Sequence, residues 1–164
     1  MSYRHKAAFC RFLDQALNNG RLEVIDELFA EDFVGHFPEW SEPRVGPGSV
    51  EDWVETVRRG FPDVNALVEG NWMTAEVDVH HVGKGVTADR LAAYVVLRGT
   101  HLGEFCGIEP SHEPIEVPQV HLLEFRGEQI VRDVVVCDRL AFLPAASAAP
   151  SLEFTHPRTP SVLI

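Results

Sequence analysis

Apolar residues recur at the spacing of a helix through the first third of the chain. Three segments carry such a stripe, which places their apolar side chains on one face of a helix. The stripes are Phe9, Phe12, Leu13, Ala16 and Leu17; Leu22, Ile25, Leu28 and Phe29; and Val50, Trp53, Val54, Val57 and Phe61. Gly20 ends the first helix, and Ser49 with Asp52 resembles a capping box at the start of the third. The pattern therefore predicts three N-terminal helices, the last ending at Pro62.

After Pro62 the apolar period changes from 3.6 to 2, which indicates β-strands. The predicted strands are 64–73, a hairpin-like excursion over 76–89 with Gly83 and Gly85 at its turn, 90–101, 114–125 and 129–138. Helices followed by a meander of long strands are typical of an α+β domain. We expect a cone-shaped, curved antiparallel sheet over residues 1–143 that encloses an apolar interior. Residues 144–164 are rich in Pro, Ala and Ser and are predicted to form a flexible or partner-docking tail.

The last two strands allow a geometric prediction. If their turn centres on Gly127, His121 lies opposite Asp133. Strand alternation then places His121, Asp133 and Val135 on one otherwise apolar face. A buried imidazole beside a carboxylate is able to exchange protons with a bound molecule. It is equally typical of a structural cross-strand pair that fixes the register of a hairpin.

Six further residues are candidate ligand contacts: His36, Phe61, Tyr94, Arg98, His101 and Val135. His36 and His101 stand where strands end, at the mouth of the expected cone. Tyr94 and Arg98 alternate along one strand and so share a face, either toward the interior or toward solvent. Phe61 is also consistent with a place in the apolar core. The chain has no Gly-rich phosphate loop, metal-binding helix motif or nucleophile elbow, so we expect no cofactor and no metal site.

Length and charge narrow the choice of partners. The 164 residues suffice for one domain, and the formal net charge of −11 repels phosphate backbones and anionic lipid, so we expect neither a nucleic-acid nor a membrane partner. Three cysteines without metal-ligand spacing are typical of free thiols, and the first residues lack the apolar run of a signal peptide. No stretch approaches the ~20 apolar residues of a membrane-spanning helix. The sequence thus predicts a cytoplasmic protein.

Four segments resemble the SnoaL-like polyketide cyclases, in the nuclear-transport-factor-two-like superfamily, over about residues 5 to 143. They read NNGRLEVIDELFAEDFVGHFP, GPGSVEDWVETVRRGFPDV, LRGTHLGEFCGIEPSHEPIEV and HLLEFRGEQIVRDVVVCD. The resemblance implies an α+β cone and ring closure by intramolecular aldol condensation without metal or cofactor. It also implies an aspartate on the last strand and a histidine one strand back. His121 matches the histidine, whereas the aspartate position falls on Val135, two residues beyond Asp133.

Three hypotheses follow for function. The first is a cofactor-free cyclase or isomerase that acts on a polyketide-like or other apolar carbonyl compound through Asp133 and His121. The second is an enzyme that adds water to an epoxide, with Arg98 beside Asp133. The third is a protein that binds an apolar small molecule without turnover. In each case we expect a homodimer through the outer face of the sheet, because apolar residues on both sides of its strands exceed what one helix layer covers.

Overall fold

The computed structural model describes residues 2–80 and 87–142. The predicted turn at Gly83 and Gly85 and the predicted tail over 144–164 lie outside the described residues. The helices are α1 (Ser2–Arg11), η1 (Phe12–Asn18), α2 (Glu23–Leu28), α3 (Pro47–Gly60) and the short η2 (Arg139–Phe142). The strands are β1 (Phe29–His36), β2 (Arg44–Val45), β3 (Asn65–His80), β4 (Thr87–Thr100), β5 (Pro114–Arg126) and β6 (Gln129–Cys137).

The first helix runs without interruption from α1 into η1, where the backbone widens to π-helical turns. Its predicted apolar face is buried, because Phe9, Phe12, Ala16 and Leu17 are each at most 1% exposed. Gly20 follows with φ at +72°, and its N–H donates to the carbonyl of Ala16. A left-handed glycine that satisfies a helix carbonyl is the predicted stop signal.

The start of α3 differs from the prediction. The helix begins at Pro47 with Gly46 as its N-cap, and Ser49 lies in the first turn. The Ser49 hydroxyl donates to the carbonyl of Gly46 at 2.7 Å instead of capping a free N–H. The predicted capping box is therefore wrong: Pro47, whose fixed φ suits the first helical position, sets the start of the helix three residues earlier.

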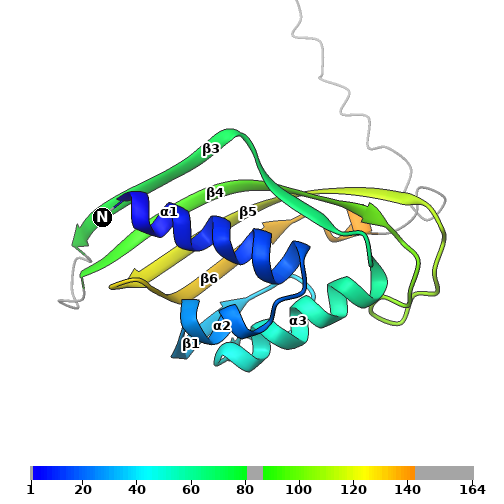
Figure 1. The fold of residues 1–164 in the computed structure, drawn as a ribbon, viewed down its shortest axis with the longest axis horizontal. Helices are drawn as coiled ribbons and strands as arrows, with labels where there is room; N and C mark the ends of the chain where they lie inside the picture. The colour runs from blue at the N-terminus through cyan, green and yellow to red at the C-terminus, as the bar shows by residue number, and fades with distance from the viewer. Residues whose placement is uncertain (1, 81–86, 143–164) are drawn as a thin grey trace, which may run out of the picture.

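The strands form one six-stranded sheet in the order β2-β1-β6-β5-β4-β3. The pairing of β1 with β6 is parallel, and the other pairings are antiparallel, so the sheet is mixed where a purely antiparallel one was predicted. Figure 1 shows the sheet curving around α1, with α2 and α3 on the same side. The α+β class and the three N-terminal helices are confirmed.

Alternation along β5 separates the two faces of the sheet. Its inward residues are all buried: Ile115, Val117, Gln119, His121, Leu123 and Phe125. They contact the helical side chains of the core, whereas the residues between them face away from the helices.

Among residues 2–80 and 87–142, every helix is too short or too polar to span a membrane.

Candidate active site

The register of the β5–β6 hairpin differs from the predicted one by two residues. The loop consists of Gly127 and Glu128 between the paired residues Arg126 and Gln129, which shifts the register by one. A bulge between the Phe125 and Glu124 pairs leaves one extra residue on β6 and shifts it by one more. His121 is therefore opposite Val135, and the predicted direct opposition of His121 and Asp133 is wrong. Beyond the bulge the total shift is even, so His121, Asp133 and Val135 keep their predicted common face; before the bulge, Ile130 is the residue opposite Phe125.

His121 and Asp133 still meet, as diagonal neighbours on the inner face. The imidazole Nδ1 of His121 lies 2.9 Å from Oδ2 of Asp133, and each side chain is only 1% exposed. The ring of Phe9 from α1 covers the imidazole with its centroid 5.1 Å away. The helix layer thus excludes water from the pair, which strengthens the interaction between its charges.

Gln119 extends this pair along the same strand face. Its side-chain oxygen lies 3.4 Å from Nε2 of His121, and its amide nitrogen is buried without a hydrogen-bond partner among the described residues. Two arrangements fit: a protonated imidazole that donates from both nitrogens, or a neutral imidazole with the amide of Gln119 turned to donate to Nε2. In both, Nδ1–H points to Asp133, and Nε2 is the nitrogen with the longer contact.

A second carboxylate enters the interior from the segment between β1 and β2. Both side-chain oxygens of Glu39 are buried, and neither has a hydrogen-bond partner of ordinary geometry among the described residues. Burial raises the pKa of the Glu39 carboxyl above its ordinary 4.5. Its own backbone N–H, the indole of Trp53 and the charges of Arg139 and His121 lower this pKa in part. Their influence places Glu39 among groups from α3, β5 and η2.

Aromatic packing holds Glu39 and Trp53 in this position. The ring of Phe37 lies 4.5 Å from that of Trp40 and 5.0 Å from that of Trp53, measured between centroids. Gly35, which pairs with Asp133 on the neighbouring strand, leaves the room that this ring occupies. A Cβ at Gly35 would lie 2.7 Å from the ring of Phe37. The segment can therefore fold inward only because position 35 lacks a side chain.

Two predicted contacts, His101 and Phe61, lie in a separate aromatic cluster. His101 is 1% exposed, and its ring lies 5.3 Å from the ring of Phe61. The backbone N–H of Ser111 donates to Nδ1 of His101, so the ring proton is on Nε2, which has no partner among the described residues. Phe61 also packs on Phe105 and Phe142. Nothing in the described contacts joins this cluster to His121.

Three other candidates face away from the interior, which is one of the two positions that the sequence left open for them. Tyr94 pairs with the outward residue Val120, and His36 pairs with Val134. Arg98 donates to Glu116 at 2.8 Å and to Glu69 on the outer surface. Strand alternation decides this, because the odd-numbered residues of β4 point inward. Val135, in contrast, is inward as predicted, 6% exposed and opposite His121.

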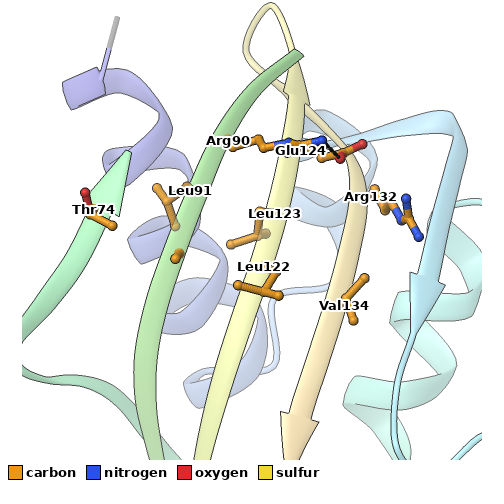
Figure 2. A pocket seen from close by; sticks show the side chains of 9 residues that line it. Thr74, Arg90, Leu91, Leu122, Leu123, Glu124, Arg132 and Val134 are labelled. Carbon is orange, nitrogen blue, oxygen red and sulfur yellow. Dashed lines mark hydrogen bonds and ion pairs between the residues drawn. The ribbon is translucent and has the colours of Figure 1, made fainter. Parts of the chain in front are cut away.

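The outer face of the sheet is hollowed rather than flat. A depression of about 410 Å³ is lined by Thr74, Arg90, Leu91, Ala92, Leu122, Leu123, Glu124, Arg132 and Val134. Figure 2 shows this pocket, with the ion pair between Arg90 and Glu124 at one end and the helices behind the strands. The hollow thus lies on the side of β5 opposite to His121.

Sequence reasoning missed Glu39, Gln119 and Trp53. Gln119 carries a usable signal, because it stands two residues before His121 and strand alternation places it on the same face. Glu39 carries none, because it lies outside any periodic segment in a stretch with Pro38 and Pro43. Trp53 was identified as part of the buried stripe of its helix, but the direction of its indole N–H depends on what packs against it.

The fold and the interior pair define a small α+β protein with a curved, open sheet and buried acid/base groups. The family model of the SnoaL-like polyketide cyclases matches residues 7–146. The chain therefore belongs to the SnoaL-like polyketide cyclase family, as its sequence motifs indicated. A search of curated proteins found no match.

Solved structures agree with this fold. A protein from Jannaschia sp. CCS1, assigned as a SnoaL-like polyketide cyclase, is 23% identical with a TM-score of 0.70, over 91% of this chain and 95% of that one. IdmH from Streptomyces antibioticus, assigned as a polyketide cyclase, is 26% identical with a TM-score of 0.63, over 85% and 95%. A Catenulispora acidiphila protein with a ketosteroid isomerase-like fold is 17% identical with a TM-score of 0.58, over 87% and 92%.

Proposed function

We propose that this protein is a cofactor-free cyclase or isomerase that moves protons on a polyketide-like or other apolar carbonyl compound. The observation that carries the proposal is the 2.9 Å contact between His121 and Asp133, both 1% exposed on a mainly apolar inner face. Family membership and the likeness to IdmH, assigned as a polyketide cyclase, support the same class of activity.

The pair supplies what such a reaction needs. A proton must leave the carbon next to a carbonyl group, and the negative charge that develops on the carbonyl oxygen must be stabilised. His121 holds its Nδ1–H toward Asp133, which leaves Nε2, 3.4 Å from Gln119, as the ring atom that would act on a bound molecule. General acid–base action of this kind contributes roughly 10² to 10⁴-fold. The apolar interior contributes the rest by fixing the substrate in one geometry.

The position of Arg98 weighs against the hydrolytic alternative. That hypothesis needs Arg98 beside Asp133, but Arg98 is bound to Glu116 and Glu69 on the outer face. Binding without turnover remains the contrasting hypothesis, and the following experiment separates it from catalysis.

The test uses 2-tetralone, a bicyclic aromatic ketone with an acidic C–H group. Proton NMR in D2O measures how fast its C1 hydrogens exchange for deuterium. We expect the protein to accelerate this exchange over buffer, and His121→Ala to remove most of the acceleration. His36→Ala is the matched control, because His36 lies on the outer face of the sheet with Val134. Exchange at the rate of buffer alone would refute the catalytic proposal.

We also propose that the protein forms a homodimer through the outer face of its sheet. Val120, Leu122 and Val136 on β5 and β6 are 36%, 46% and 57% exposed, and Leu67 on β3 is 50% exposed. Contiguous apolar surface of this kind marks an interaction site. A two-fold interface uses the same patch on both subunits, which suits a hollowed sheet face.

A further inference from the structure

The carboxylate of Glu39 has no structural partner that accounts for its burial. A buried charge is costly unless it is paired or hydrogen-bonded. The inner carboxylate Asp133 meets this condition through His121, whereas neither oxygen of Glu39 has a hydrogen bond of ordinary geometry among the described residues. Glu39 is thus a buried acid that its own backbone N–H, the indole of Trp53 and the nearby charges compensate only in part.

Other unpartnered polar atoms lie in the same interior. They are Nε1 of Trp53, the side-chain nitrogen of Gln119 and Oδ1 of Asp133. Each of these three side chains is at most 2% exposed. Native proteins leave few such atoms without a partner, and those that remain call for an explanation. A bound molecule with oxygen atoms is able to satisfy a donor such as the side-chain amide of Gln119.

We propose that Glu39 is the catalytic base of this interior, taking a proton from the carbon next to the carbonyl of a bound apolar ketone. The proposal rests on the proposed function and assigns a separate role to each group. Glu39 removes the proton from the carbon, and His121, oriented by Asp133, stabilises the carbonyl oxygen. Glu39 comes from the segment between β1 and β2, whereas the pair lies on the sheet. The substrate would therefore lie between the two groups.

The step balances without an added reactant. The C–H bond breaks, its proton goes to the Glu39 carboxylate, and its electron pair forms the double bond of an enolate. The carbonyl π electrons move to the oxygen, which accepts a hydrogen bond from Nε2–H of His121 in the arrangement where both ring nitrogens donate. In ring closure the enolate carbon attacks a second carbonyl of the same molecule and forms a C–C bond. The resulting alkoxide takes the proton back from Glu39.

The surroundings of Glu39 suit a stronger base than an exposed carboxylate. Burial raises the pKa of its carboxyl, and the charged groups that face it are His121 on β5 and Arg139 on η2. Burial is the main cause that raises the pKa of the thiols of Cys137 on β6 and Cys106 after β4, and the negative charge of Glu39 raises both further. A carboxyl with a raised pKa and few hydrogen bonds is a stronger base than an exposed one.

The experiment follows deuterium exchange of 2-tetralone against pH for three proteins. In the unmodified protein we expect the rate to rise with pH as Glu39 loses its proton, and then to level off. Glu39→Gln should lower the rate about 100-fold and abolish this rise. Glu42→Gln is the matched control: the same substitution in the same segment, at an exposed position. It should keep both the rate and the pH profile.

A melting curve checks that the Glu39→Gln protein is folded. Folding raises the pKa of the Glu39 carboxyl, so the protein loses stability as pH rises from the ordinary value of 4.5 through the raised value. The variant lacks this loss, so its melting temperature relative to the unmodified protein should be higher at about pH 8 than at about pH 4. Glu39→Asp, which keeps the acid on a shorter side chain, should restore part of the pH-dependent exchange.

The outcomes separate the two proposals. Exchange at the rate of buffer alone in the unmodified protein refutes the proposed function and this inference with it. Accelerated exchange that Glu39→Gln leaves within about twofold, while Asp133→Asn abolishes it, refutes only the role of Glu39 and assigns the base to Asp133. Loss of the rise with pH in Glu39→Gln, with Glu42→Gln unaffected, supports the inference.

Discussion

The two faces of strand β5 carry opposite arrangements of polar and apolar side chains. Inward, Gln119 and His121 are polar groups with at most 2% exposure in an apolar core. Outward, Val120 and Leu122 are apolar groups with 36% and 46% exposure. Each face thus contains the kind of residue that its environment disfavours: buried polar residues inside and exposed apolar residues outside. The two kinds alternate along one strand.

The comparison teaches that the two departures have different physical meanings. Burying a polar group costs free energy that must be recovered through a partner, and Asp133 is that partner for His121. Exposing an apolar group costs little in an isolated chain, but it contributes free energy when another surface covers it. The inner face therefore suggests chemistry, and the outer face suggests association.

The largest expected effect comes from breaking the inner pair. His121→Ala leaves the carboxylate of Asp133 buried without its partner, so the free energy of unfolding should fall by about 3–5 kcal/mol. Replacing both residues by Leu should cost much less than the sum of the single changes, because no charge remains buried. Urea unfolding monitored by circular dichroism measures both. A cost of the double variant equal to the sum of the two single costs would show that the pair contributes no coupling.

The next effect concerns the outer face. Leu122→Glu places a charge at the centre of the proposed dimer interface, and we expect roughly a 100-fold weaker dimer. Sedimentation velocity measures this, and Glu116→Gln, an exposed position at the far end of β5, serves as the control. If the unmodified protein sediments as a monomer at micromolar concentration, the dimer proposal is wrong.

The smallest effect is expected at the ion pair of the outer hollow. Nη2 of Arg90 lies 3.0 Å from Oε1 of Glu124, and the two side chains are 33% and 25% exposed. A double-mutant cycle with Arg90→Gln and Glu124→Gln should give a coupling of about 0.2–1 kcal/mol that salt weakens. The same cycle on His121 and Asp133 should give a larger, salt-insensitive value. Similar values for both pairs would remove the contrast between the two faces.

The sequence by itself determined the periodicities, and through them the helices, the strands and most of the groups of strand residues that share a face. His121 and Asp133 share a face because alternation survives an even change of register. The register itself required the structure, because a two-residue loop and a bulge on β6 depend on how the hairpin packs and not on the period. Tyr94 and Arg98 show the complementary case, in which alternation paired them correctly but did not say which face was inside.

Only the tertiary structure decided the rest of the site. Glu39 is far from His121 in the sequence and lies in a segment without hydrophobic periodicity, so no local pattern predicts its position. The contact between the rings of Phe37 and Trp53, together with the missing side chain of Gly35, brings the segment that carries Glu39 into the interior. Burial of a side chain outside regular structure depends on what long-range packing places over it, and that packing forms only when the helices close on the curved sheet.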